Sequence, residues 1–434
     1  MTETSATSPD VVRWVWRHVR AERFYRDSAW LTMALLSVNV SNYVLNVAVS
    51  RILGRPQFGE VAAILALLYV LNVPTTAIQT LLTREVAQLA DPDELPAVFR
   101  SIRRVVWRWA VVAGVLTLAL TPLVVAFLHL DSYTPALFLP FLVGLALLVP
   151  MYRGILQGRR RFGLLTVNVG AEAALRVIGA ILLTLLGFKA AGVMGAFAVG
   201  LVASLILGRV FTRAELSAGS TRARSSASSH LAELVPVIAG LGLVTAAFNL
   251  DVILGRHFLS PVGGGEYAAV SLVARVLFYL TSSVGGAVVA SRIPDQARGR
   301  LKLLAQGLAV VVGTAAVGEA ACLLFPREVV IAVFGSAYSE AAPVLPLLGA
   351  GMVALSATNL LVYFLLAMRL RAFAVLQLAG LALEVGLIAW RHQTLNDIAL
   401  AFTAASVAVA VALGAVAMIA ALRLGPVSPS REPG

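Results

Sequence analysis

Six charged residues stand inside stretches of sequence that are otherwise almost entirely apolar, and these side chains are the ones best placed to do chemistry. They are two basic and four acidic residues: Glu172, Arg176, Asp251, Arg275, Glu319 and Glu384. A charge at membrane depth costs several kcal/mol unless it is paired or faces a wet cavity, so each is a candidate functional group. The chemistry open to them is the binding of an ionic ligand or the carriage of a proton or cation.

Arg275 is the first candidate for ligand binding. It stands about 11 residues into the apolar stretch 264–290, roughly 16 Å along a helix and near its middle. A guanidinium there could hold an anionic group through charge-assisted hydrogen bonds. Asp251, beside Asn249 near the end of the stretch 231–255, allows three interpretations. It could pair with Arg275 and make that residue structural only, bind a coupling proton or cation, or anchor its helix at the interface.

The remaining four groups favour structural roles. Glu172 and Arg176 are four residues apart, the spacing that puts both on one helix face, which favours mutual neutralisation. For Glu319 and Glu384 the sequence names no partner; a protonated carboxyl turned toward a neighbouring helix or a role in proton coupling would each fit. Two positive and four negative groups do not describe a cationic cavity. Three arginines near the outer mouth, at the ends of apolar stretches, could supply the missing positive field: Arg51, Arg55 and Arg256.

Asn72 and Pro74 interrupt the apolar stretch 60–83. A proline inside a helix leaves a backbone carbonyl without its donor and permits bending. The pair therefore predicts a hinge or a cation-coordinating kink, although an ordinary kink of the kind common in membrane helices also fits.

The elements that carry these residues are membrane-spanning helices. The 434-residue chain is 59% hydrophobic and only 13% charged, with a mean hydropathy of +0.88, whereas soluble domains are about one-quarter charged. A bilayer core needs about 20 apolar residues per helix. The first stretch is followed by eleven more and lacks a small-residue cleavage pattern, so we expect it to remain in the mature protein. The sequence predicts an all-α polytopic fold of about twelve helices, at residues 29–50, 60–83, 105–129, 134–156, 164–187, 190–212, 231–255, 264–290, 303–325, 341–367, 372–390 and 396–422.

The basic residues predict the orientation. Of the 34 Lys and Arg residues, 26 fall in the N-terminal segment, the loops after even-numbered helices and the C-terminal tail. Short basic loops stay in the cytoplasm, so we expect both termini to be cytoplasmic. Topology and attraction to anionic membrane lipids then account for the net charge of +12, and nucleic-acid binding need not be invoked.

Composition divides the chain into five parts. We expect a basic amphipathic cytoplasmic N-terminus, a first six-helix bundle, a Ser- and Arg-rich flexible linker, a second six-helix bundle and a disordered tail. Their bounds are 1–28, 29–212, 213–230, 231–423 and 424–434.

An internal repeat relates the two bundles. Shifting the chain by 206 positions aligns Gly59-Glu60 with Gly265-Glu266, and an Ala-Ala pair follows shortly in both copies. Six helices per half put both halves in the same orientation, so the repeats are parallel and their pseudo-symmetry axis should run along the membrane normal. Such a pair encloses a central cavity that can open to either side.

Residues 53–59 and 259–269 resemble the outer connections after helices 1 and 7 of polysaccharide flippases, in the superfamily of multidrug, oligosaccharidyl-lipid and polysaccharide exporters. Further likeness comes from residues 153–162, and the resemblance spans about 29–420. The first copy departs from the family in having Arg55 where proline is common. The resemblance implies that helices 1, 2, 7 and 8 line the cavity and that a cation such as Arg275 holds the pyrophosphate of a polyprenyl-linked sugar.

Enzymes are excluded by what the sequence lacks. The five histidines are scattered, the single Cys322 rules out a Cys-rich metal site, and no phosphate-binding GxxxxGK[ST] loop is present. The longest outer loop, about 326–340, is short for a polymerase or ligase of envelope sugars. We therefore expect no catalytic residue, no metal and no cofactor.

The sequence thus predicts a multi-pass protein of the bacterial inner membrane that flips a polyprenyl-(pyro)phosphate-linked saccharide to the outer leaflet by alternating access. Envelope glycan polymerases or glycosyltransferases are candidate partners. A cation-coupled small-molecule exporter of the same fold is the alternative, but it should carry an acidic residue deep in the first helix, and 29–50 has none. A non-transporting scaffold for envelope enzymes would instead have a closed cavity packed with apolar side chains.

Overall fold

The computed structural model describes residues 9–89, 91–217, 227–290, 294, 296–368, 370 and 372–423, and the side chains of 9–28, 31, 35, 92, 227–239, 241, 283–290, 372 and 423 are not part of that description. The described chain is helical almost throughout. Its elements are α1 (Pro9–Leu53), α2 (Arg55–Leu71), α3 (Val73–Gln88), η1 (Pro92–Glu94), α4 (Leu95–Phe127), α5 (Thr134–Gly158), α6 (Phe162–Leu183), η2 (Thr184–Phe188), α7 (Lys189–Ser217), α8 (Ala227–Phe258), α9 (Pro261–Ala290), α10 (Ala297–Leu324), α11 (Pro326–Phe334), η3 (Ser336–Val344), α12 (Leu345–Ala367), α13 (Ala372–Trp390) and α14 (Leu395–Arg423).

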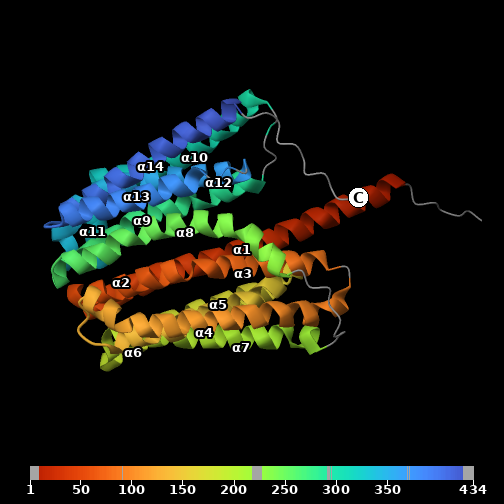
Figure 1. Ribbon diagram of the computed structural model, residues 1–434, viewed down its shortest axis with the longest axis horizontal. Coiled ribbons are helices and arrows are strands. Elements are labelled where there is room, and N and C mark those ends of the chain that lie inside the picture. Colours follow the sequence, from red (N-terminus) through yellow and green to blue (C-terminus); the bar gives the residue numbers. More distant parts are fainter. Residues whose placement is uncertain are drawn as a thin grey trace, which may run out of the picture.

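The helices form two groups that follow the chain. In Figure 1, α1 to α7 form the lower group and α8 to α14 the upper one, and the axes of the long helices are roughly aligned with one another. Nine described stretches are long and apolar enough to cross a membrane, and one of them, Phe162–Ser217, contains both α6 and α7. With α8 and α9, of 32 and 30 residues, the count reaches the predicted twelve.

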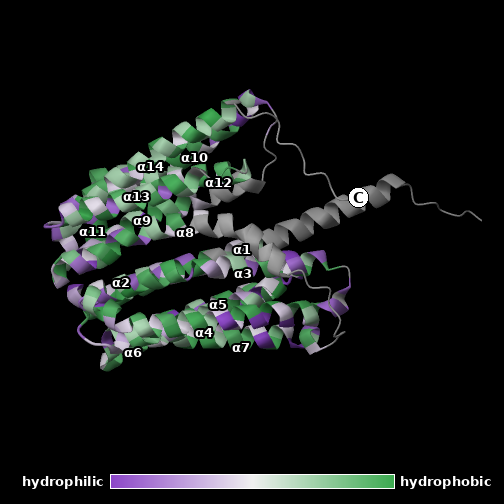
Figure 2. Cartoon of the chain, in the orientation of Figure 1, coloured by the Kyte–Doolittle hydropathy of each residue, from purple (hydrophilic) through white to green (hydrophobic). Residues whose placement is uncertain are grey.

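Apolar side chains cover the outside of the bundle as well as its core. Figure 2 shows hydrophobic residues along the length of most helices, with hydrophilic ones concentrated at helix ends and turns. On α4, Val112, Val115 and Leu123 are 65%, 62% and 63% exposed. Such a surface is stable only against lipid, so the chain is a multi-pass membrane protein.

The two halves meet through α2 and α3 on one side and α8 and α9 on the other. Gly54 makes this possible, because its positive φ of 74° ends α1 and the chain turns directly into α2. Arg55 and Pro56 then form the first turn of α2, where a missing N–H costs nothing. We call the end of the bundle where α2 and α9 begin the glycine end, after Gly59 and Gly265, and the opposite end the arginine end.

Three features differ from the predicted elements or lie outside the description. Residues 326–340, expected as a loop, fold into α11 and the first part of η3. Phe334 of α11 and Tyr338 of η3 are buried against α2. The N-terminal segment forms one continuous helix with the first span from Pro9, and the amphipathic character predicted for 1–28 lies outside the described side chains. Within the predicted linker 213–230, residues 213–217 continue α7 and 227–230 begin α8, so its predicted bounds were too wide. Residues 218–226 and the tail 424–434 lie outside the described residues.

Candidate functional site

A cavity of about 470 Å³ lies between the two halves, where α1 and α2 face α8 and α9. Its lining is mostly apolar, and among the described residues that line it Arg275 is the one that carries a charge. The polar lining residues are Asn39, Asn42, Tyr43, Asn46, Tyr69, Arg275 and Tyr279. A pocket of this volume with a few converging polar groups is typical of a small-ligand site.

Arg275 is held in place by the helix it faces. Its Nη2 donates to the carbonyl oxygen of Phe248 at 2.6 Å and to Oδ1 of Asp251 at 3.2 Å, and its Nη1 lies 3.4 Å from Oδ1 of Asn249. The guanidinium also stacks over the Phe248 ring at 4.6 Å. The three polar contacts use part of the five N–H groups of an arginine, and Nε has no partner among the described residues.

Asp251 is completely buried, so its charge depends on its partners. Besides Arg275 it accepts hydrogen bonds from Tyr267 Oη at 3.2 Å and Ser271 Oγ at 3.0 Å. Tyr267, Ser271 and Arg275 repeat every four residues along α9 and therefore share the face turned to α8. The pair that the sequence left open does form, and Arg275 lines the cavity as well.

Three asparagines on α1 make the opposite wall, and sequence reasoning missed them. Asn39, Asn42 and Asn46 follow the i, i+3, i+7 spacing of one helix face, and all three line the cavity together with Tyr43. The search for charged groups passed over these amides because they carry no charge. Their spacing within an apolar helix was the signal that could have found them.

At the glycine end the two halves touch backbone to backbone. A Cβ added to Gly59 would lie 2.8 Å from the Gly265 nitrogen, and one added to Gly265 would lie 1.8 Å from the Arg55 carbonyl oxygen. Positions related by the 206-residue repeat can meet only where they approach the pseudo-symmetry axis. The two glycines therefore mark that axis and close the cavity at this end.

Two ion pairs cross between the halves beside the glycines. Glu266 of the second half pairs with Arg55 of the first at 2.5 Å, and Glu60 of the first pairs with Arg256 of the second at 3.2 Å. Arg256 is 3% exposed. It also donates to the carbonyl oxygens of Leu128 at 3.0 Å and His129 at 2.9 Å. The two glutamates that the repeat aligns thus each pair with an arginine of the other half, although the repeat does not align the two arginines with each other.

The three arginines expected to charge the cavity are all used at this end. Arg51 donates to the carbonyl oxygens of Ala332 and Val333, at 3.0 and 2.8 Å, in the last turn of α11, where the helix dipole favours a cation. Together with Arg55 and Arg256 it binds the other half, and none of the three is among the residues that line the cavity.

Glu172 lies at the centre of a buried polar network in the first half. Arg176 pairs with it as the four-residue spacing predicts, and Arg153 of α5, which the sequence placed only in a connecting motif, pairs with its other oxygen. Arg153 Nε donates to Asn168 at 2.8 Å, and Arg176 Nη1 donates to Asn42 at 3.3 Å. The network therefore reaches the cavity wall through Asn42.

Glu319 and Glu384 are both buried in the second half, each with one carboxyl oxygen that has no hydrogen-bond partner among the described residues. Glu319 lies against α12, where a Cβ on Gly349 would collide with its carboxyl. Glu384 lines a space of about 20 Å³ with Thr358 and Gln377, room for about one water molecule. Neither residue lines the central cavity.

Asn72 separates α2 from α3, so the interruption expected at this position is present. Pro74, in the first turn of α3, cannot donate to a carbonyl one turn earlier. The equivalent positions of the second half hold Phe278 and Leu280, and α9 runs through them without a break. The kink therefore belongs to one half alone.

The described residues contain no group of His, Cys, Asp and Glu that could hold a metal ion. What the cavity offers is hydrogen bonding from amides and phenols around one guanidinium, which suits a polar ligand with an anionic end.

A family model described as polysaccharide biosynthesis protein matches residues 24–294, more than half of the chain. The chain belongs to the polysaccharide biosynthesis protein family. No curated protein matches the sequence.

Solved structures of transporters share the fold of this polysaccharide biosynthesis family member. A multidrug resistance MATE family transporter of the MOP superfamily in an inward-facing conformation superposes with a TM-score of 0.75 at 11% identity, over 88% of this chain and 96% of that one. A MATE family transporter of the same superfamily in an outward-facing conformation superposes with a TM-score of 0.58 at 16% identity, over 91% of this chain and 94% of that one. The eukaryotic MATE transporter AtDTX14 superposes with a TM-score of 0.60 at 15% identity, over 91% of this chain and 96% of that one. The predicted twelve-helix, two-repeat fold and the predicted likeness to a polysaccharide family are confirmed.

Proposed function

We propose that the protein is a flippase that moves a polyprenyl-(pyro)phosphate-linked saccharide from the cytoplasmic to the outer leaflet of a bacterial inner membrane. The observation that carries this proposal is the lining of the central cavity. Amide groups both donate and accept hydrogen bonds, as sugar hydroxyls do, and Asn39, Asn42 and Asn46 present three of them along one wall. The membership of a polysaccharide biosynthesis family agrees with such a cargo.

Arg275 is the group that would receive the phosphate. One hydrogen of Nη1 is not used by its contacts with Phe248, Asn249 and Asp251, and the unpartnered Nε–H is buried behind it. Because Asp251 neutralises much of its charge, we expect Arg275 to position the phosphate by directed hydrogen bonds more than to attract it over a distance. The sugar would lie toward α1 and the lipid chain would stay in the bilayer.

The closed glycine end supports a cytoplasm-open state that loads cargo. With both termini in the cytoplasm, as the basic loops predict, the glycine end faces outward. The higher similarity to the inward-facing transporter than to the outward-facing one agrees with this orientation, at TM-scores of 0.75 and 0.58. Transport would then require the contacts around Gly59 and Gly265 to separate while the arginine end closes.

The competing functions fit the cavity less well. A cation-coupled exporter of small molecules would place an acidic side chain in the cavity, and none of the described lining residues is acidic. A non-transporting scaffold would have apolar packing between its halves, whereas about 470 Å³ with a polar wall lies there.

Deletion of the gene tests the function directly. We expect cells without the protein to retain a lipid-linked saccharide in the cytoplasmic leaflet, measured by its inaccessibility to an externally added, membrane-impermeant glycosidase. Unchanged export of every envelope glycan in those cells would refute the proposal. Mass spectrometry of lipids that copurify with the protein should identify the saccharide, and glycan polymerases or glycosyltransferases that copurify would be its partners.

The role of Arg275 needs a variant that does not leave a buried charge behind. Arg275→Ala alone strands Asp251, which costs about 3–5 kcal/mol for a buried pair, so lost transport would be ambiguous. The double variant Asp251→Asn/Arg275→Gln removes both charges, keeps the volume of Asp251 and shortens Arg275 while leaving a polar amide in its place. We expect it to be folded and to lose transport; a folded double variant with normal transport would show that Arg275 serves stability alone.

A further inference from the structure

A second site lies in the first half, away from the central cavity. A crevice of about 650 Å³ runs between α4, α5 and α7, and a smaller one of about 270 Å³ continues from it. The two share Arg100, Arg103, Tyr152 and Arg209. None of these residues lines the cavity between the halves. The crevice is therefore separate from the proposed transport path.

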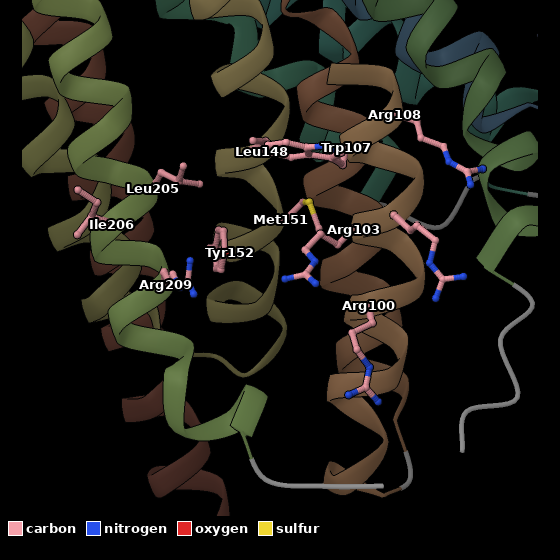
Figure 3. A pocket seen from close by; sticks show the side chains of 11 residues that line it. Arg100, Arg103, Trp107, Arg108, Leu148, Met151, Tyr152, Leu205, Ile206 and Arg209 are labelled. Carbon is pink, nitrogen blue, oxygen red and sulfur yellow. The ribbon is translucent and has the colours of Figure 1, made fainter. Parts of the chain in front are cut away.

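The charge of this crevice is of one sign. Among its described lining residues no acidic side chain occurs, and the arginines are Arg100, Arg103, Arg104, Arg108, Arg209 and Arg213. Figure 3 shows Arg103 of α4 and Arg209 of α7 on either side of Tyr152, with Arg100 one turn below Arg103 and Arg108 turned away from them. Like charges at these helical spacings repel one another, so an anion between the helices would stabilise the arrangement.

Local packing builds the crevice. A Cβ on Gly208 would lie 2.7 Å from the Cβ of Tyr152, so the glycine lets α7 lie directly against α5 and brings Arg209 to the crevice wall. Tyr152 packs against Phe99 with ring centroids 5.4 Å apart, and the Arg103 guanidinium lies 5.9 Å from the same Phe99 ring. The floor is thus an aromatic pair that spaces the arginines of two helices.

The depth of the crevice corresponds to lipid headgroups. Residues 110–127 of α4 form an apolar stretch about 27 Å long, close to the thickness of a bilayer core. Trp107 and Trp109, 56% and 45% exposed, stand at its end, where tryptophan marks the membrane interface. Arg100 and Arg103 lie about 9–14 Å farther along the helix, beyond the hydrocarbon.

The upper wall is apolar. Trp107 and Leu148 line the crevice on the side toward the bilayer, and Leu205 and Ile206 continue it on α7. A ligand that fits both walls has an anionic head and a hydrocarbon tail. Positive charges placed only to orient the chain would need neither the aromatic floor nor the apolar wall.

We propose that this crevice binds the phosphate headgroup of a membrane lipid from the leaflet at the arginine end. The phosphate lies between Arg103 and Arg209, and the acyl or prenyl chain leaves past Trp107 into the bilayer. The crevice shares no lining residue with the central cavity, so the binding of lipid there can be tested separately from the flippase function.

The test removes one arginine from each wall. In the purified full-length protein, native mass spectrometry with added phosphatidylglycerol measures lipid affinity for wild type and for Arg103→Gln/Arg209→Gln. We expect the double variant to bind about 30-fold more weakly, from roughly 1 kcal/mol for each basic residue. The matched control is Arg298→Gln/Lys302→Gln on α10, which removes the same charge from the corresponding helix of the second half and should change the affinity less than about threefold.

Further ligands separate the sources of phosphate. Phosphatidylcholine should bind weakly because its headgroup carries no net charge, and undecaprenyl phosphate should show the same dependence on the two arginines as phosphatidylglycerol. The tighter of these two anionic lipids identifies the resident ligand.

Two results would overturn the site. One is an equal loss of lipid affinity in the test and control variants, and the other is phosphatidylcholine binding as tightly as phosphatidylglycerol. Inorganic phosphate that competes as strongly as the lipids would overturn the assignment to a lipid. Because these arginines are exposed, both variants should keep the wild-type elution volume on size exclusion.

Discussion

The contact between Gly59 and Gly265 predicts that one methyl group can change which side of the transporter is open. In Gly265→Ala the new Cβ would lie 1.8 Å from the carbonyl oxygen of Arg55, where an ordinary contact is 3.4 Å or more. The obstacle is backbone rather than a flexible side chain. The two halves would therefore have to separate by about 1.6 Å at this point for the closed glycine end to survive.

Overpacking of this kind costs about 1–3 kcal/mol when the surroundings yield in part. The cost falls on the state with a closed glycine end and is relieved when the halves part. We therefore expect the ratio of closed to open molecules at this end to fall about 5- to 150-fold. Gly59→Ala, whose Cβ would lie 2.8 Å from the Gly265 nitrogen, should shift the ratio in the same direction by less.

Spin labels on opposite halves can measure this shift. Tyr133 and Trp390, 55% and 81% exposed, follow α4 and end α13 near the glycine end. In a Cys322→Ala background, cysteines at these two positions carry the spin labels. Double electron–electron resonance should then show, in Gly265→Ala, a larger population at a longer label-to-label distance, which corresponds to molecules open at the glycine end. The neighbouring Gly264→Ala is the control, because its Cβ would make an ordinary 3.4 Å contact while the gain in helix propensity is the same.

The result that would refute this reasoning is the same distance distribution in Gly265→Ala and Gly264→Ala, with both proteins folded. If Gly265→Ala does not fold, Gly59→Ala carries the test, and an unchanged distribution there would be equally contrary.

Four further predictions concern buried polar groups and the kink. Glu60→Gln should lower the thermal unfolding midpoint in detergent more than Glu266→Gln, because the arginine paired with Glu60 is 2% exposed at its side chain and the one paired with Glu266 is 33% exposed. Glu172→Gln should destabilise the protein by about 3 kcal/mol, the lower end for a buried pair, since it leaves two guanidiniums that are 18% and 14% exposed without their shared carboxylate. An unfolding midpoint equal to wild type would contradict this role of the network. Glu384→Gln should leave the unfolding midpoint and transport in reconstituted vesicles unchanged, because a neutral carboxyl and an amide are similar in shape and polarity. If transport by the variant instead stops responding to an imposed proton gradient, Glu384 takes part in coupling. Pro74→Ala should raise the unfolding midpoint and slow transport if the break at α2 and α3 is a hinge, and transport at the wild-type rate would make it an ordinary kink.

Most of the fold could be predicted from the sequence because the bilayer imposes it. A chain that crosses lipid must satisfy its backbone hydrogen bonds within each helix, so apolar stretches of sufficient length can be read directly as spans. The repeat of Gly59-Glu60 at Gly265-Glu266 likewise predicted two related halves, and the spacing of Glu172 and Arg176 predicted their pair. These are local patterns, visible along the chain.

The partners of long-range groups could not be predicted in this way. Arg51, Arg55 and Arg256 were expected to charge the cavity, but the structure uses all three to join the halves at the glycine end. Their partners Ala332, Glu266 and Glu60 each lie more than 190 residues away in sequence, and the other cross-half partner of Arg256, Leu128, lies 128 residues away. Nothing in the local pattern distinguishes an arginine that faces a cavity from one that faces another backbone.

The sequence by itself therefore determined that the chain is a twelve-helix membrane protein with two halves, because hydrophobic length and repetition act along the chain. Only the tertiary structure decided which groups face the cavity. It placed the uncharged asparagines of α1 opposite Arg275, left Glu319 and Glu384 outside, and brought arginines of α4 and α7 to the two sides of Tyr152. The reason is physical: the cost of a buried charge or amide depends on what lies across the interface, and that is set by how the helices pack.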